Sequence, residues 1–322
     1  MQGLVFMKKF KKAALLLVAV IVLSTAGFLL QDNMQSSTIN ARAMISSSAE
    51  QFFEDPLSDI VVSEPKLACR YYMDNDFKRS IKGAEPVVLK DRKLIGGIVS
   101  HHLLADSMIA PFFATMSVGK PDIVFIVGPN HKRTGQKKIN TGYWDWQTPN
   151  GVLESDSEAV NSLVESCQAG QDFNLLETEH SVSSLVPYVK YYMPEAKIVP
   201  VLLHGNLGIE GSKDLALKIR ESAGSQKWIV IGSIDFSHYL PPDTADKMDE
   251  ITLKAIETSN LEAINRMGND NLDSPPSVMT LLEIMRGEGK YEIKVTGHTN
   301  SAEIAGIYSD STTSYFTMLF YQ

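Results

Sequence analysis

The stretch Asp122–Val127, with the sequence DIVFIV, decides the fold of this chain. An unbroken apolar run of this length is typical of a strand that is covered on both faces. A similar run, LIGGIVS at Leu94–Ser100, precedes it, and Leu104–Val118 between them has apolar residues at helical spacing. This strand–helix–strand unit predicts two parallel strands, so His101 and His131, which follow them, should lie at one edge of a sheet.

The same alternation continues to the end of the chain. Further strands are expected at Lys197–Leu203, Lys227–Gly232, Ile293–Thr296 and Tyr315–Phe320. Helices are expected at Ser155–Ala169, Ser181–Met193, Ile209–Ala223, Ala245–Glu257, Leu261–Met267 and Ser277–Arg286. The pattern predicts an α/β fold, a single-domain sandwich whose central sheet is mostly parallel or mixed and is flanked by helices.

Length and composition limit the possible classes of protein. The chain has 322 residues, 44% of them hydrophobic and 21% charged, which is usual for a globular protein and excludes disorder, collagen or coiled coil as a description of the whole. We expect one domain over residues 65–322, because no linker divides residues 90–322. The net charge of −8 makes nonspecific binding to nucleic acid or anionic lipid unfavourable.

The N-terminal residues have the pattern of a targeting segment. Lysines at positions 8, 9, 11 and 12 precede Ala13–Leu30, which is 18 residues without a charge. Residues 1–31 are therefore expected to be a signal peptide or an N-terminal membrane anchor, and the polar residues 32–64 a flexible tether. Lysines before the apolar run favour export, so the body is expected to be extracytoplasmic, either membrane-anchored or secreted.

The chain has only two cysteines, Cys69 and Cys167. Two cysteines cannot build a Cys₄ zinc site or a disulfide framework. Export would permit a disulfide between them, and two free thiols fit the sequence equally well.

Other histidines also follow predicted elements. The strand Lys227–Gly232 leads into Ser233-Ile-Asp-Phe-Ser-His238, which places Asp235 and His238 at a similar edge, and His180 stands at a predicted helix start. Because ligands of open α/β sheets bind at the carboxyl ends of the strands, this placement predicts a metal or acid–base site. His204 and His298 are interpreted as structural. The sequence lacks a phosphate-binding loop, a dinucleotide fingerprint, a nucleophile elbow and an HExxH motif.

Several short motifs occur in a diagnostic order. They are GPNH at 128–131, EHSV at 179–182, VPY at 186–188, SIDFSH at 233–238 and TSY at 313–315. In combination they resemble the Memo family, called AmmeMemoRadiSam system protein B in prokaryotes, over roughly residues 65–322. The resemblance implies a fold similar to that of class III extradiol dioxygenases, which carry a non-haem iron in an α/β sandwich.

The resemblance also implies a metal site. His101 and His131 match the two family histidines, although the sequence around His101 departs from the family pattern and leaves His102 as an alternative. The third family ligand is often a cysteine. Asp273 takes its place here, with Ser274 or Asp235 as alternatives.

The remaining pocket residues are assigned to proton transfer or to support of the ligands. His180, His238 and Asp235 fit family positions that line the pocket, and His180 is the candidate base. Two histidines and a carboxylate are typical of non-haem Fe(II) oxygenases, so the cofactor is expected to be a divalent metal, Fe(II) first, with Cu or Zn as alternatives.

Three functions are compatible with this site. The first is a metal-dependent oxidoreductase of the dioxygenase type; the second is a non-catalytic module that binds a small molecule or a peptide; a metallohydrolase is third, because several of its motifs are absent. The family name implies partnership with radical SAM and AMMECR-type proteins. Those partners are normally cytosolic, which conflicts with an exported chain.

Overall fold

The computed structural model describes residues 64–135 and 137–322. The predicted signal peptide or anchor and the tether up to residue 63 lie outside the described residues and stay predictions. None of the described helices is both long and apolar enough to cross a membrane.

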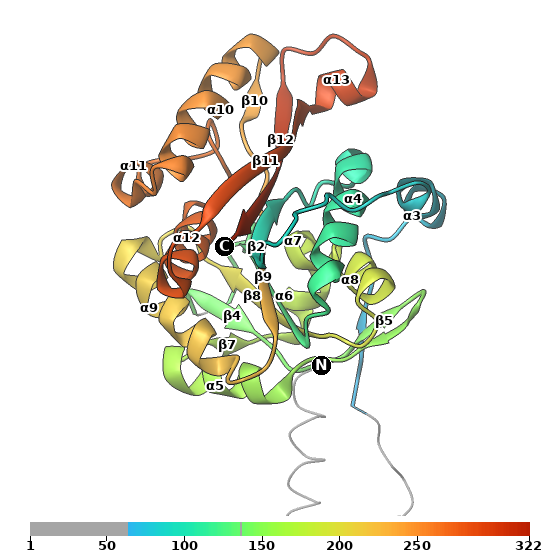
Figure 1. Cartoon of the computed structure of the whole chain (residues 1–322), viewed down its shortest axis with the longest axis vertical. Coiled ribbons are helices and arrows are strands. Elements are labelled where there is room, and N and C mark those ends of the chain that lie inside the picture. The colour runs from blue at the N-terminus through green and yellow to red at the C-terminus, as the bar shows by residue number, and fades with distance from the viewer. Residues whose placement is uncertain (1–63, 136) are drawn as a thin grey trace, which may run out of the picture. The chain divides into compact units, whose positions relative to one another are not determined.

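A nine-stranded mixed sheet forms the centre of the described residues (Figure 1). Its middle is parallel and consists, in spatial order, of β2 (Leu94–Val99), β9 (Trp228–Ser233), β3 (Ile123–Pro129) and β8 (Lys197–Leu203). The prediction that β2 and β3 run parallel is confirmed, and β9 lies between them. All four carboxyl ends therefore meet at one edge of the sheet.

Antiparallel strands extend the sheet on both sides. Next to β2 lie β12 (Thr312–Tyr321) and its partners β10 (His238–Leu240) and β11 (Glu292–Asn300). Next to β8 lies β4 (Ile139–Thr141), which pairs in turn with β7 (Gly170–Gln171). The expected α/β fold with a mixed sheet is thus present.

A small three-stranded sheet accompanies the large one. It consists of β1 (Leu67–Ala68), β5 (Trp146–Thr148) and β6 (Gly151–Leu153). The hairpin between β5 and β6 buries the Trp146 ring completely, so this tryptophan serves packing.

Helices cover both faces of the large sheet (Figure 1). Before β8 they are α3 (Asp74–Ile81), α4 (Asp106–Met116), α5 (Ser157–Cys167), α6 (Phe173–Thr178), α7 (His180–Ser183) and α8 (Val186–Tyr192), with 3₁₀ turns at Leu103–Ala105 and Ser117–Gly119. After β8 they are α9 (Gly208–Ser222), α10 (Pro242–Glu257), α11 (Leu261–Asn265), α12 (Pro275–Glu288) and α13 (Ser301–Ala305).

The prediction of one helix over Ser181–Met193 was wrong. Two helices, α7 and α8, occupy this region. Pro187 lies in the first turn of α8, where a missing backbone N–H costs nothing, whereas the interior of a longer helix would lose a hydrogen bond there.

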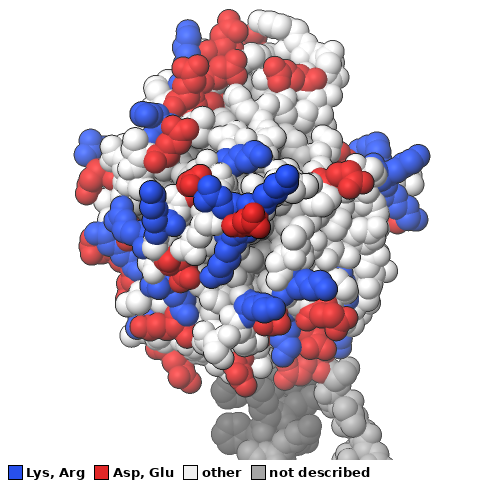
Figure 2. All heavy atoms as spheres, viewed as in Figure 1, with Lys and Arg blue, Asp and Glu red and all other residues white. Residues whose placement is uncertain are grey.

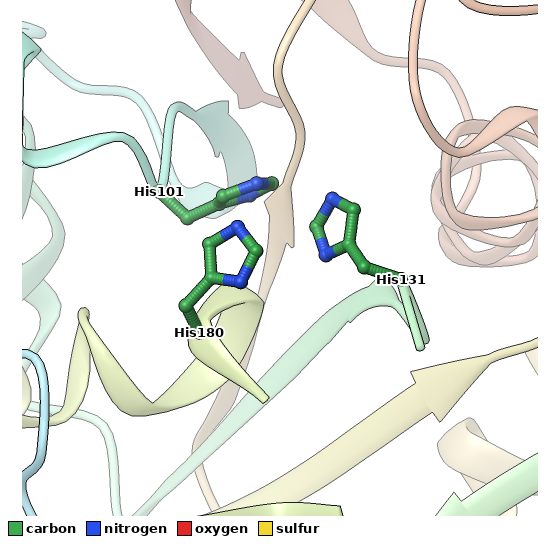
Figure 3. Close-up of side chains that lie close together, drawn as sticks. All are labelled: His101, His131 and His180. Carbon is green, nitrogen blue, oxygen red and sulfur yellow. The ribbon is translucent and has the colours of Figure 1, made fainter. Parts of the chain in front are cut away.

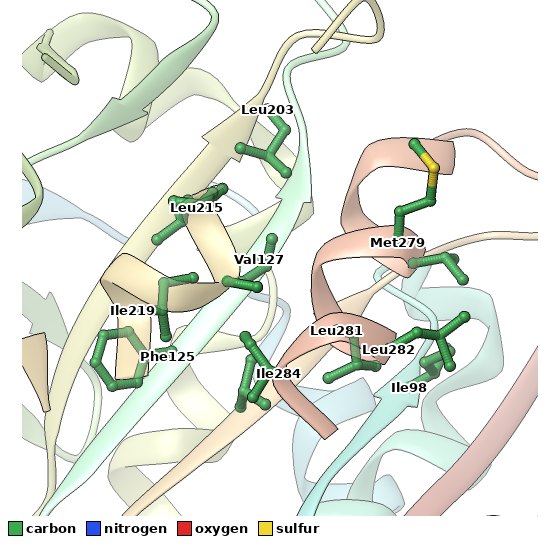
Figure 4. Packing of buried hydrophobic residues seen from close by; sticks show 14 of the residues in the cluster. Ile98, Phe125, Val127, Leu203, Leu215, Ile219, Met279, Leu281, Leu282 and Ile284 are labelled. Carbon is green, nitrogen blue, oxygen red and sulfur yellow. The ribbon is translucent and has the colours of Figure 1, made fainter. Parts of the chain in front are cut away.

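Alternate residues of β3 face opposite layers of the core. Phe125 and Val127 belong to the apolar cluster that contains Leu215 and Ile219 of α9 and Ile284 of α12 (Figure 4). Val124 and Ile126 belong to the cluster on the other face, which contains residues of α4 and α8. Burial on both faces is the physical reason for the unbroken apolar run.

Both cysteines are free thiols, so the alternative of a Cys69–Cys167 disulfide is not realised. Burial raises the pKa of Cys69 to about 12 and also raises the pKa of Cys167. A protonated thiol is a poorer nucleophile and metal ligand than a thiolate, and within the described residues neither cysteine belongs to a group spaced for one ion.

Candidate metal centre

Three histidines converge at the carboxyl edge of the sheet (Figure 3). His101 follows β2, His131 follows β3, and His180 is the first residue of α7. The ring centroid of His101 lies 5.1 Å from the centroid of each of the other two rings. The His131 and His180 rings are stacked, with their centroids 4.3 Å apart. Each ring offers a nitrogen within 4.8 Å of the other two, close enough for one ion to contact all three.

Two aspartates complete the cluster. Oδ2 of Asp273 lies 3.4 Å from Nε2 of His101 and 3.5 Å from Nε2 of His131. Oδ2 of Asp235 lies 3.5 Å from the same His101 nitrogen. The structure therefore brings the three predicted metal-ligating residues together, with Asp235 beside them.

Backbone pairing fixes Asp273 at this edge. Phe236, just after β9, forms an isolated antiparallel bridge with Leu272. The amide of Asp273 donates to the carbonyl of Asp235 at 3.1 Å, and the amide of Asp235 donates to Oδ2 of Asp273 at 3.2 Å. The other carboxylate oxygen, Oδ1 of Asp273, is buried without a hydrogen-bond partner, which is costly unless a cation is nearby.

Glu179 orients two of the histidines, and sequence reasoning did not assign it a role. Its carboxylate is completely buried and accepts from Nδ1 and the amide of His131 at 2.8 and 2.9 Å. Nδ1 of His180 lies 3.2 Å away. Burial opposes ionisation, yet the His131 and His180 imidazoles hold the pKa of Glu179 well below its usual range. In the sequence, this role of Glu179 is indicated by its position directly before His180 in the EHSV motif.

The protonation of His131 follows from these neighbours. Burial alone would lower its pKa, but Asp273 and Glu179 outweigh burial and raise the pKa of His131 to about 10. With Nδ1 committed to Glu179, the second proton of this ring sits on Nε2, toward Asp273. A metal ion at the centre would displace that proton.

Hydrogen bonds also define the tautomer of His101. The Ser233 hydroxyl donates to the Ser181 carbonyl, so it accepts the proton of His101 Nδ1 at 3.1 Å. Burial lowers the pKa of His101, and the Asp235 and Asp273 carboxylates oppose this shift. Nε2 of His101 faces the oxygens of Asp235 and Asp273 at 3.5 and 3.4 Å, a position at which a cation would be stabilised.

The alternative ligands lie differently. His102 is exposed, and its Nδ1 lies 2.5 Å from the Tyr315 hydroxyl. The Ser274 hydroxyl is 2.6 Å from that of Ser277 at the start of α12. Geometry thus favours His101 and Asp273 over these neighbours.

Asp235 and His238 occupy the border of the centre. Asp235 Oδ1 accepts from the Ser100 hydroxyl, and despite burial the His101 imidazole and this hydrogen bond lower the pKa of Asp235. His238 is half-buried, and its Nδ1 has no partner among the described side chains. Within the described residues, His238 is part of no group of ligand atoms spaced for one ion.

The two histidines interpreted as structural make local contacts. His298 Nε2 bonds to Oδ2 of Asp249 at 2.9 Å, and its ring stacks on Phe316 with centroids 4.1 Å apart. His204 Nδ1 accepts from the amide of Asn206 at 3.4 Å. Ligand atoms of Asp246, Asp249 and His298 also lie within 4.8 Å of one another, so these residues form a second group that is spaced for one ion.

Comparison with known proteins agrees with the sequence motifs. The MEMO1 family protein PAE0818 of Pyrobaculum aerophilum is 28% identical over 237 residues, which cover 71% of this chain and 84% of that protein. A MEMO1 family protein of Desulfurococcus amylolyticus is 27% identical over 266 residues, 78% of this chain and 93% of the relative. The crystal structure of an uncharacterized protein, JW3007 from Escherichia coli K12, aligns at 12% identity with a TM-score of 0.45, over 70% of this chain and 99% of that one. Residues 73–319 match the family described as Memo-like protein, and this chain therefore belongs to the Memo family.

Proposed function

We propose that the centre holds one divalent transition-metal ion through Nε2 of His101, Nε2 of His131 and Oδ2 of Asp273, and that the chain is a metal-dependent oxidoreductase. The observation that carries the proposal is the spacing of these atoms, with Asp273 Oδ2 at 3.4 and 3.5 Å from the two nitrogens. Two ligand atoms that each lie about 2.1 Å from one ion are about 3.0 Å apart at the 90° angles of an octahedral site and about 3.4 Å apart at a tetrahedral angle, so the observed spacings are near the range that one ion requires.

The chemistry of the donor set supports an oxidoreductase. Two imidazoles and one carboxylate are the ligands of non-haem Fe(II) oxygenases, and they leave coordination positions open for other molecules. Copper and zinc also accept imidazole, so they are the competing ions. The bound ion would supply Lewis acidity and one-electron redox chemistry.

The protein's own groups would handle protons and orientation. Glu179 and Ser233 fix the rings of His131 and His101, so that Nε2 of each points to the centre. His180 is more accessible, with 40% of its side chain exposed, and its Nδ1 faces Glu179. Its Nε2 is then the atom that takes a proton from a substrate hydroxyl.

Metal analysis of the full chain tests the proposal. Protein purified anaerobically and loaded with Fe(II), Cu(II) or Zn(II) in turn is expected to retain about one ion per chain, and His131→Ala is expected to lose at least about 99% of the affinity. His204→Ala is the matched control, because this ring lies outside the cluster. Full retention of the ion by His131→Ala would contradict the proposal.

Dioxygen consumption separates an enzyme from a binding module. The iron-loaded chain is expected to consume dioxygen with a phenolic or other chelating substrate, and His180→Gln is expected to slow the reaction about 100-fold while the ion is retained. A stoichiometric ion without turnover of any such compound would leave the non-catalytic binding function as the better account.

A further inference from the structure

A cavity of about 650 Å³ lies at the edge of the sheet opposite to the metal centre. Leu94 and Trp228, the first residues of β2 and β9, line it, whereas His101 and Ser233 belong to the other ends of these strands. Six residues of strand separate Leu94 from Ser100, which corresponds to about 20 Å. The cavity is therefore separate from the proposed metal-dependent function.

The walls of the cavity are mainly apolar. The segment Pro86–Leu89 forms one wall, and Val118 and Pro121 contribute to another. Val88 and Val118 are 75% and 68% exposed, so apolar surface at the mouth of the cavity is accessible to a ligand. The size and lining match those of small-molecule sites, so the occupant is expected to have an apolar body.

The rim of the cavity is cationic. Arg92, Lys93 and Lys227 line it together with one acid, Glu288, which is already paired with Arg220 at 2.9 Å. Arg92 pairs with Glu292 outside the lining at 3.2 Å.

The two lysines are the part of the rim that is available to a ligand. Among the described residues, the ammonium group of neither Lys93 nor Lys227 forms an ion pair, although the Asp122 carboxylate accepts from the backbone amide of Lys227 at 2.9 Å. Figure 2 shows Lys and Arg side chains in the middle of the viewed face, with fewer Asp and Glu side chains among them. On a chain with a net charge of −8, this local surplus selects for a negatively charged group.

We propose that this cavity binds a small amphipathic anion, a carboxylate with an apolar chain or ring. Its carboxylate lies between Lys93 and Lys227, and its apolar part covers Val88 and Val118. The two ends of the ligand match the two kinds of lining, which neither a free inorganic anion nor a neutral lipid would do.

Calorimetric titration of the full chain with octanoate tests this proposal, with 1-octanol as the uncharged counterpart. Octanoate is expected to bind saturably at one site per chain and at least about tenfold more tightly than 1-octanol, because charge-assisted hydrogen bonds add to apolar burial. The double variant Lys93→Gln/Lys227→Gln is expected to bind octanoate about tenfold more weakly. Val88→Asp, at an exposed position that tolerates a polar side chain, is expected to weaken binding as well.

Two controls isolate the cavity. Lys247→Gln removes an exposed lysine of α10 and should leave octanoate binding unchanged. His131→Ala, in metal-free buffer, should also leave it unchanged, which excludes coordination of the carboxylate at the metal centre. The proposal is overturned if octanoate does not saturate, if 1-octanol binds equally well, or if the lysine double variant binds like the wild type.

Discussion

His101 and His131 are fixed by different partners, and this difference sets their charge. Ser233 is a neutral acceptor and burial lowers the pKa of His101, whereas the Glu179 and Asp273 carboxylates raise the pKa of His131. In the absence of an ion, the proton of His131 partly compensates the buried carboxylates. A divalent ion would supply more positive charge at the same place, which explains why the cluster is chemically suited to bind one.

Asp273→Asn tests the carboxylate at the centre. Asparagine keeps the shape and can still accept from the Asp235 amide, but it lacks the charge that binds an ion. We expect metal affinity to fall about 100-fold while the free energy of unfolding of the metal-free protein changes by no more than about 1 kcal/mol. Chelator competition and urea unfolding measure the two quantities. Asp246→Asn, an exposed acid beside His298, is the control, and equal loss of affinity in both variants would argue against Asp273 as a ligand.

His298 makes the unfolding free energy depend on pH. The hydrogen bond with Asp249 raises the pKa of His298, with Asp246 and Glu303 adding to the effect, so the folded state favours the imidazolium. This stabilisation is present below the ordinary histidine pKa of about 6.5 and is lost as pH rises through the higher folded-state value. His298→Gln should therefore be less stable than wild type by about 1 kcal/mol at pH 6, and the difference should shrink by pH 9. A difference that does not change with pH, or the same trend in His204→Gln, would refute this assignment.

At the scale of elements, the close packing of β2 positions His101. A Cβ atom on Gly97 would collide with the Met318 carbonyl of β12 and would lie 2.5 and 2.6 Å from side-chain atoms of Met116 and Phe112 on α4. The strand fits between β12 and β9 because neither Gly97 nor Gly96 has a side chain; a Cβ on Gly96 would collide with the Val230 carbonyl of β9. His101 is the second residue after the end of β2, so its position depends on how β2 fits between its neighbours.

Gly97→Ala is accordingly expected to be costly. Overpacking at this position should lower the free energy of unfolding by about 2–3 kcal/mol and should also weaken metal binding, because β2 must shift. Gly205→Ala is the control, since no heavy atom lies within 4 Å of its added Cβ and the expected change is below about 0.5 kcal/mol. Thermal or urea unfolding of both variants gives the comparison, and equal stability would contradict the packing argument.

The buried strands could be predicted from the sequence because burial on both faces leaves an apolar run. β2, β3, β8 and β9 begin and end within two residues of the predicted bounds. The edge elements could not be predicted in this way. β11 is nine residues long and only its last residue is buried, so its polar C-terminal half gave no apolar signal, and the β5–β6 hairpin has only three residues per strand.

The candidate centre could be predicted in part. His101 and His131 were found because each follows a buried strand. The carboxyl ends of parallel strands lie at the same edge of a sheet, so residues that follow such strands lie close together. Glu179 was missed because only the fold brings its carboxylate to His131, which lies 48 residues earlier in the chain. The approach of Asp273 depends on the bridge between Phe236 and Leu272, residues distant in sequence, for which no local pattern exists.

At the scale of the whole molecule, an ion at the centre would join segments that are far apart in the chain. Its proposed ligands follow β2 and β3 and precede α12, so unfolding would require its release. Ions at about 100 times the dissociation constant should add about 2.7 kcal/mol to the free energy of unfolding. This corresponds to a rise of roughly 5–10 °C in Tm for a body of this size. The rise should be absent in His131→Ala, and an equal rise in both proteins would indicate binding elsewhere.

The position of a bound ion shows directly whether His101, His131 and Asp273 are its ligands. Crystals of the anaerobically iron-loaded chain, measured at the iron absorption edge, would locate it by anomalous scattering. We expect one peak about 2.0–2.2 Å from Nε2 of His101, Nε2 of His131 and Oδ2 of Asp273. A peak only at Asp246, Asp249 and His298, or a fully iron-loaded protein with no peak among the three strand-edge histidines, would contradict it.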